Sequence, residues 1–515
     1  MPFIDANKHL KEVDWTGFDV TIVGAGAAGI MLAILLGQRG KRVLMIESGH
    51  FELDPDRQSL NRLEQSAKQM TDVIWNHKRA IGGTTLEWGG QSLPFSPCDF
   101  GKRDWVDHSG WPISYEALSS YYNLANRFMG IDELNYDTDI LALLGREAPG
   151  VDAKLLRYHF SKWAKQPNFV KLHRADLERH ATVLYNAHLL RIDLGDNSRV
   201  KTIEVGDFRA RRQTIPAATL VLAAGGIETN RILLHNDHQQ KGGLGNASDW
   251  LGKAFMEHPC LDVGHVESDD MEGLQQIFGT RLRRGLRYSV RLSTTAGWQE
   301  RHRLLAASAS LMWLYEGDEV GPLSELRSFV RRPRLGDALR IAKGGGQLAQ
   351  GLWALARTGL IYKPGAGARV SLMCEQEPSR DSYVALSNDR DRFGMRIARL
   401  NWNISPKTWA TVVAFSQTLA AEMQRSGLGR LRLLDHVRAD AADPEIHLSD
   451  VNHHMGGARM SASPADGVVD DRLRLWGVPN LRVCSAAVFP TGSHSNPTLT
   501  LLALTARLAD GLTAA

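Results

Sequence analysis

The start of the chain alternates short apolar runs with a longer apolar segment of helical periodicity. Residues 19–23 form a compact apolar run, a glycine-rich segment follows at 24–29, and an apolar helical pattern continues over 30–38. A second apolar run at 43–46 leads into Glu47. Strand, glycine turn, helix and strand in this order predict a βαβ unit.

Patterns of the same kinds recur further along the chain. Residues 219–223 predict a strand that enters a glycine turn, and a helix follows over 228–234. The polar stretch 51–70 has a helical pattern, and the apolar segment 499–508 predicts a buried helix. Alternating runs in the second half of the chain predict strands at 287–292, 369–373, 383–386 and 394–400.

These elements predict an α/β protein of two domains. A Rossmann-like dinucleotide-binding domain would be built from both chain ends, residues 1–265 and 450–515, and an α+β substrate domain, residues 266–449, would be inserted between them. A length of 515 residues fits two packed domains.

The composition excludes some classes of protein. The chain carries 61 lysines and arginines against 57 aspartates and glutamates, and this small excess does not indicate nucleic-acid binding. The four cysteines are scattered, so they predict neither a zinc site nor a disulfide framework and fit a reducing compartment. No run reaches the roughly 18 apolar residues of a membrane span, and residues 1–14 lack the apolar core of a signal peptide. We therefore expect a cytoplasmic protein.

The glycines of the βαβ unit have separate functions in dinucleotide binding. Gly24 allows a tight turn, Gly26 lets the backbone approach a pyrophosphate, and Gly29 lets the helix pack closely on the strand. The helix that begins there offers free N–H groups to the phosphates. Glu47 follows at the distance where an acid accepts hydrogen bonds from ribose hydroxyls, and its charge would repel the 2′-phosphate of NADP. The motif alone does not separate FAD from NAD.

Besides the βαβ unit, the chain contains five other motifs. Residues 452–460 have the sequence NHHMGGARM, and residues 495–500 have the sequence SNPTLT. With the segments 81–90, 110–115 and 251–259, the chain resembles the glucose–methanol–choline (GMC) oxidoreductases over most of its length. The sequences of these motifs are most similar to those of pyranose oxidases and related bacterial sugar and glycoside oxidoreductases.

The resemblance implies an FAD enzyme that oxidises an alcohol, here a secondary hydroxyl of a sugar or glycoside, by hydride transfer to flavin N5. The matching positions make His453 the general base and Asn496 its partner on the substrate oxygen, roles that suit a neutral imidazole and an amide. The expected cofactor-binding residues are Gly24, Gly26, Gly29, Glu47, Gly83, Thr84, Ala224, Ser485, Asn496, Pro497 and Thr498. Gln376 and His494 are candidate substrate contacts. The adjacent His453 and His454 do not predict a metal site, because neighbouring side chains rarely converge and no third ligand is spaced to join them.

One position departs from the pyranose-oxidase pattern. Where those enzymes have a histidine bonded covalently to the flavin, this chain has Glu87, ahead of Trp88. FAD is therefore expected to be bound non-covalently. The electron acceptor stays open between oxygen and a quinone-like molecule.

A basic stretch at 327–363 has three interpretations. It carries eight basic residues against one acid. It could contribute to a lid over the active site at 320–365, contact a membrane or a redox partner, or be a solvated insertion with neither function. For the whole protein, a flavin-containing lyase, an oxidoreductase acting on a non-sugar alcohol and a binding protein without turnover are the alternatives.

Overall fold

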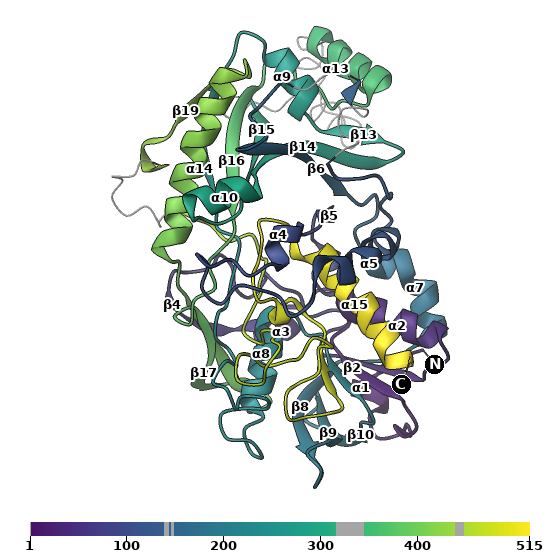
Figure 1. Ribbon diagram of the computed structural model, residues 1–515. Coiled ribbons are helices and arrows are strands. Elements are labelled where there is room, and N and C mark those ends of the chain that lie inside the picture. The colour runs from purple at the N-terminus through teal and green to yellow at the C-terminus, as the bar shows by residue number, and fades with distance from the viewer. Residues whose placement is uncertain (1, 138–143, 146–148, 316–344, 438–446, 515) are drawn as a thin grey trace.

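The structure is a computed structural model that describes residues 2–137, 144–145, 149–315, 345–437 and 447–514. Its first layer is a parallel sheet of six strands that joins both ends of the chain (Figure 1). The strand order is β1 (Phe3–Asp5), β7 (Thr182–Tyr185), β3 (Val43–Glu47), β2 (Val20–Val23), β11 (Leu220–Leu222) and β20 (Leu481–Val483). Because β20 comes from the C-terminal part and pairs with β11, the predicted closure of this domain by both chain ends is present in the sheet.

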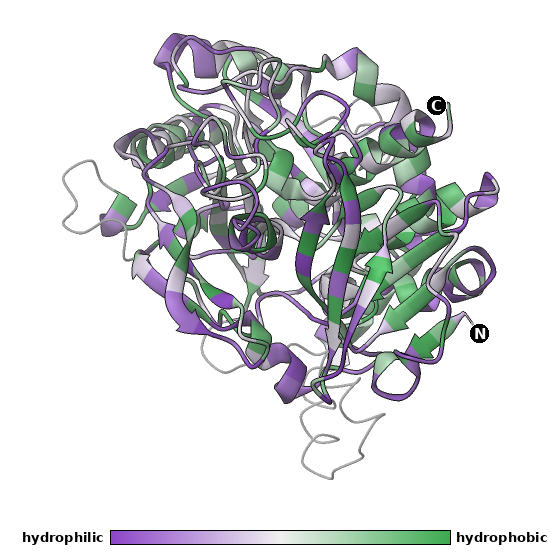
Figure 2. Cartoon of the chain, turned by 90° about the horizontal axis from the view of Figure 1, so that it is seen from below, coloured by the Kyte–Doolittle hydropathy of each residue, from purple (hydrophilic) through white to green (hydrophobic). Residues whose placement is uncertain are grey.

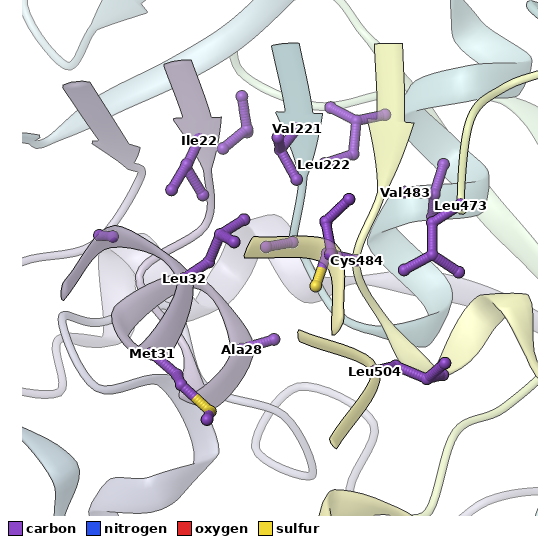
Figure 3. Packing of buried hydrophobic residues seen from close by; sticks show 14 of the residues in the cluster. Ile22, Ala28, Met31, Leu32, Val221, Leu222, Leu473, Val483, Cys484 and Leu504 are labelled. Carbon is purple, nitrogen blue, oxygen red and sulfur yellow. The ribbon is translucent and has the colours of Figure 1, made fainter. Parts of the chain in front are cut away.

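Helices pack around this sheet, and its central strands β2, β3 and β11 are completely buried. The helices are α1 (Ala6–His9), α2 (Ala27–Gln38), α5 (Tyr115–Phe128), α7 (Phe169–His180), α8 (Gly226–His235) and α15 (Pro497–Thr513). Most of α2 is buried because the helix lies between the sheet and α15, so its sequence is apolar on every side. Figure 3 shows Ile22, Val221 and Val483 of three neighbouring strands above Leu32 of α2 and Leu504 of α15. The strands of this sheet are correspondingly hydrophobic (Figure 2).

A second large sheet is antiparallel and forms the upper half of the molecule in Figure 1. Its order is β19 (Arg430–Leu433), β12 (Cys260–Glu267), β16 (Gly367–Cys374), β15 (Ala307–Leu314), β14 (Leu286–Thr294), β6 (Leu156–Trp163) and β5 (Gln91–Ser92), with β13 (Arg281–Arg283) beside β14. The chain segments between its strands form the helices α9 (Met271–Phe278), α10 (Ala296–His302) and α14 (Pro406–Arg425). Val290, Val370 and Leu372 belong to a second hydrophobic core that includes residues of α14. The alternate residues of these strands are more polar and lie on the opposite face.

Two smaller sheets complete the fold. One is antiparallel and contains β8 (Ala187–Leu194), β9 (Val200–Asp207) and β10 (Arg212–Pro216). The other contains β17 (Tyr383–Arg390), β18 (Arg396–Trp402) and β4 (Leu63–Ala67). Short helices are α3 (Pro55–Gln58), α4 (Pro97–Phe100) and the 3₁₀ turns at Ser59–Asn61, Gly83–Leu86, Asp435–Val437 and Ala486–Val488.

The strands and helices expected from the pattern are confirmed, with one exception. The stretch 51–70 is not one helix: it contains the single turn of α3, a 3₁₀ turn and then strand β4. Strand β4 pairs in parallel with β18, from residue 63 opposite Ala398 to residue 67 opposite Trp402. Pairing with a strand more than 300 residues away outweighs the local helical pattern there.

The division of the chain at residues 265 and 450 stays a prediction. The second large sheet also takes strands β5 and β6 from the part of the chain before residue 265. Residues 320–344 of the stretch proposed as a lid lie outside the described residues, and the rest of it begins with α13 (Gly345–Thr358). Within the described ranges, no helix is both long and apolar enough to cross a membrane.

Candidate active site

One large cavity, of about 1160 Å³, is lined by residues of both large sheets. Its walls include the turn after β2, the end of β3, the start of α15 and the polar face of the antiparallel sheet. This volume exceeds the roughly 300–1,000 Å³ of common ligand pockets. The cavity is therefore large enough for a dinucleotide together with a second, smaller molecule.

The three glycines after β2 differ in the space around them, as their separate functions require. Gly24 has φ +105°, and a Cβ placed on it would lie 2.5 Å from the carbonyl oxygen of Ala223. A Cβ on Gly29 would lie 2.0 Å from the carbonyl oxygen of Gly24, so Gly29 is required for packing. A Cβ on Gly26 would meet no atom within 4 Å and would extend into free space, and Gly26 lines the cavity. Gly83 closes the opposite side, since its Cβ would lie 2.9 Å from the Cα of Gly26.

Glu47 lies at the end of β3 and is 6% exposed. One carboxylate oxygen accepts the N–H of Ala25 at 2.9 Å, and the other accepts the N–H of Gly49 at 2.8 Å. Burial raises the pKa of Glu47 above its ordinary value, and these two hydrogen bonds act in the opposite direction. Each oxygen has a further lone pair for a ribose hydroxyl.

The other predicted cofactor residues are brought together at the same cavity. Those that line it are Gly24, Gly26, Glu47, Gly83, Thr84, Ala224, Ser485, Asn496, Pro497 and Thr498. Gly29 does not, in agreement with its packing position. These residues fit FAD: the glycine turn after β2, Glu47 at the end of β3 and the start of α15 surround one space. The free N–H groups at the N-terminus of α2 are available for the phosphates. Residues Ala187, His188 and Leu189 of β8 also line the cavity, and no pattern in the sequence predicted this wall.

His453 and Asn496 meet at the cavity wall. The side-chain amide Nδ2 of Asn496 lies 3.1 Å from Nε2 of His453, and both residues line the cavity. On the other side of the ring, Nδ1 of His453 lies 2.8 Å from Nδ1 of His258. Nε2 of His258 in turn lies 3.1 Å from the carbonyl oxygen of Gly492. His258 belongs to the segment 251–259 quoted in the sequence, but its function was not predicted.

This chain of contacts fixes the protons on both imidazole rings. The carbonyl of Gly492 can only accept, so Nε2 of His258 carries a proton and donates it. In a neutral ring the Nδ1 of His258 is then an acceptor, and Nδ1 of His453 must donate to it. The remaining nitrogen, Nε2 of His453, has no proton and accepts from the amide of Asn496.

Both imidazole rings are neutral at neutral pH. Burial lowers the pKa of His258 to about 4. Burial also lowers the pKa of His453 well below its ordinary value, and the neighbouring His258, His454 and Arg291 lower it further.

Glu257 joins the two segments that carry these histidines. Its carboxyl group is fully buried and accepts the backbone N–H groups of His258 and His453. Burial raises the pKa of Glu257 to about 8. The carboxyl group thus holds residues 257–258 against residue 453 and sets the distance between the two rings.

Two predicted substrate contacts lie elsewhere. Gln376 is fully buried away from the cavity: its Oε1 accepts from the N–H of Glu257 and from Nε1 of Trp402, both at 2.9 Å. His494 is 2% exposed, does not line the cavity, and lies beside the ring of His159 at 5.6 Å between centroids. Neither side chain reaches the cavity, so the structure corrects both expectations.

Glu87 and Trp88 line the cavity as the motif predicts. The carboxylate of Glu87 pairs with Nζ of Lys78 at 2.6 Å, and about half of its side chain is exposed. A paired carboxylate occupies the position at which the resemblance places a flavin-bonding histidine.

The fold and this site define a class of protein: a dinucleotide-binding oxidoreductase whose cavity brings a neutral histidine and an asparagine together. Comparison with known proteins is more specific. Residues 378–505 match the family model of the GMC oxidoreductases, and residues 17–57 match an FAD binding domain. The chain therefore carries a GMC oxidoreductase domain together with an FAD-binding domain, and it is an FAD-dependent oxidoreductase.

Known relatives differ in what they act on. The chain is 25% identical to 2-methyl-1,2-propanediol dehydrogenase of Mycolicibacterium austroafricanum, over 96% of this chain and 94% of that protein. It is 22% identical to paromamine 6'-oxidase of Streptomyces fradiae, over 96% of this chain and 91% of that protein. Among solved structures, pyridoxine 4-oxidase from Mesorbium loti superposes with a TM-score of 0.56 at 16% identity, over 96% of this chain and 99% of that chain. This last similarity concerns the fold alone.

Proposed function

We propose that this enzyme oxidises a secondary hydroxyl group of a sugar or glycoside to a carbonyl, with His453 as the general base. The observation that carries the proposal is the hydrogen-bonded chain from Gly492 through His258 to His453. The chain leaves Nε2 of His453 free of a proton at the cavity wall, where a substrate hydroxyl can reach it.

His453 and Asn496, the catalytic pair, would act on the same substrate oxygen. The hydroxyl donates its proton to Nε2 of His453, while Nδ2 of Asn496 turns its hydrogen bond onto the same oxygen and holds it in place. Bound FAD supplies the acceptor for the hydride that leaves the carbon. The new positive charge on His453 is shared through Nδ1 with His258, whose position is fixed by Gly492.

The polar sheet face above the pair suits a substrate with several hydroxyl groups. Gln91, Ser310 and Ser371 line the cavity and carry hydrogen-bonding side chains, and Trp163, opposite Gln91, also lines it. An aromatic ring covers the C–H face of a sugar, while amide and hydroxyl groups bind its oxygens. These four residues favour a sugar or glycoside over a simple apolar alcohol.

The cofactor-binding residues of the sequence prediction would hold FAD without a covalent bond. The position ahead of Trp88 holds Glu87, which is paired with Lys78. We expect acid precipitation of the purified protein to leave all of the yellow flavin in the supernatant. Yellow colour that stays in the washed pellet would contradict non-covalent binding.

The experiment is a turnover assay with a panel of pyranoses, glycosides and simple alcohols. Oxygen and a quinone-like dye are supplied in parallel as electron acceptors, and the product is identified as ketone, aldehyde or cleavage product. We expect ketone formation by the wild type and a loss of about 10²–10⁴ in kcat for His453→Ala. The matched control is His454→Ala, at the neighbouring position, which should keep most of the activity. Equal rates for wild type and His453→Ala, or a cleavage product, would contradict the proposal.

A further inference from the structure

The sheet that faces the catalytic pair presents an arginine to the cavity. In β14, Leu286, Val290 and Leu292 are buried in the core, and the alternate residues Arg287 and Arg291 lie on the opposite face. Arg291 lines the same cavity as the catalytic pair. Its charge also contributes to lowering the pKa of His453, so the two side chains are close enough to interact.

Among the described residues, Arg291 differs from other arginines of this sheet face in having no ion-pair or hydrogen-bond partner for its side chain. Arg369 forms an ion pair with Asp262 at 3.1 Å, and the guanidinium of Arg287 lies over the ring of Trp163 at 5.9 Å. In the part of the chain that the structure describes, Arg291 makes no ion pair or side-chain hydrogen bond, and its Nε is buried without an acceptor.

The guanidinium of Arg291 at the cavity wall favours the binding of an anion beside it. Burial lowers the pKa of Arg291 to about 10, which still leaves the guanidinium charged at neutral pH. Arg291 is half-buried, and a charge partly removed from water without a partner is unfavourable. An anionic group bound in the cavity would supply that partner.

Two serine hydroxyls extend the row of donors from Arg291 across the sheet. Strand β15 pairs with β14 so that Leu292 lies opposite Ala309, which places Ser310 next to Arg291. Ser310 lies opposite Ser371 of β16, and both serines line the cavity. A guanidinium with hydroxyl donors beside it matches the two oxygens of a carboxylate.

We propose that Arg291, with Ser310 and Ser371, binds a carboxylate group of the substrate, so that the enzyme acts on alcohols that carry a carboxylate, such as sugar acids. The proposal rests on the proposed function, since it uses the same cavity as the place of oxidation. One guanidinium balances one negative charge, which favours a carboxylate over a phosphate with nearly two charges.

The test compares matched pairs that differ by a carboxylate. Binding to the FAD-loaded enzyme is measured by calorimetry for methyl glucuronide against methyl glucoside, gluconate against glucitol, and glycerate against glycerol. We expect the acid of at least one pair to bind at least tenfold more tightly than its neutral partner. Arg291→Met should remove this preference while neutral ligands bind as before, and Arg291→Lys should keep part of it.

Arg287→Met is the matched control, because Arg287 lies on the same face of β14 but outside the cavity wall. It should keep the full preference for the acid. Equal affinities within every pair in the wild type, or a preference that survives Arg291→Met, would overturn the carboxylate site. Failure of the proposed function has a separate sign, because a bound acid or alcohol would then leave the flavin oxidised in the absence of oxygen whatever its affinity.

Discussion

At the scale of single residues, the chemistry depends on which ring nitrogen of His453 carries the proton. A histidine in a motif does not reveal its tautomer, and here the tautomer follows from a backbone carbonyl two hydrogen bonds away. His258 touches neither the proposed reacting oxygen nor Asn496. It is a positioning residue, and it should affect rate and pH dependence without being indispensable.

Replacing His258 tests this function. In His258→Leu, Nδ1 of His453 loses its acceptor, so both tautomers become populated and kcat should fall by about tenfold, less than in His453→Ala. His258 also lowers the pKa of His453, so its removal raises that pKa and moves the acid limb of the kcat/KM profile to higher pH. His258→Asn restores an acceptor oxygen and should recover part of the rate. An unchanged pH profile in His258→Leu would show that His258 only fills space.

At the scale of elements, the turn between β2 and α2 separates cofactor binding from folding. We predict that Gly26→Ala keeps the fold, because the added methyl has no atom of the described residues within 4 Å. The methyl should weaken FAD binding at least tenfold, about 1.4 kcal/mol. Gly29→Ala is the control, since its methyl would lie 2.0 Å from the carbonyl of Gly24 and should disrupt the packing of α2 as well. Flavin content and far-ultraviolet circular dichroism measure the two effects. Normal flavin content in Gly26→Ala would contradict this assignment.

How much the sequence predicts also differs between elements. The βαβ unit and α15 follow from local apolar periodicity and glycine spacing, which act over a few residues. Strand β4 could not be predicted in this way, because its partner β18 is more than 300 residues away. The same limit applies to the site. His453 and Asn496 follow from the motifs that carry the family resemblance. Arg291 becomes notable only when the paired strands place it at the cavity, where no described residue pairs with it.

Gln376, in contrast, was predicted as a substrate contact but is buried away from the cavity. Its place in a polar segment suggested a substrate contact, but both ends of its amide are used by buried backbone and side-chain groups, including Trp402 and the carbonyl of Asn403. A polar residue in a sequence does not distinguish a buried hydrogen-bonding centre from a cavity wall.

At the scale of the whole molecule, seven histidines among the described residues have pKa values strongly lowered by burial, so their rings are neutral at neutral pH. They are His77, His159, His188, His258, His453, His454 and His494. The unfolded chain takes up protons at these sites below about pH 6.5, whereas the folded protein does not until much lower pH. Their contribution to stability is therefore full above pH 6.5 and is lost as the pH falls from there towards 4.

We predict that the thermal unfolding midpoint of the FAD-loaded enzyme falls steeply between pH 6.5 and 4.5, and that it changes much less between pH 7 and 8, where, of these buried groups, Glu257 alone titrates. Each histidine contributes a slope of about 1.4 kcal/mol per pH unit. Glu47 and Glu257, whose pKa values are raised by burial, oppose the loss but are fewer. Differential scanning calorimetry over this range measures the effect. A midpoint that stays constant down to pH 4.5 would mean that the buried histidines are charged in the folded protein.

The central claim is that FAD bound in this cavity accepts a hydride from an alcohol carbon while His453 takes the proton of the hydroxyl group. The measurement that tests it most directly is the visible spectrum of the purified enzyme without oxygen, before and after addition of a pool of sugars, sugar acids, glycosides and simple alcohols. The account predicts that the flavin band bleaches in the wild type and bleaches about 10²–10⁴ times more slowly in His453→Ala. A flavin band that no member of the pool bleaches, or one that bleaches equally fast in both proteins, would contradict it.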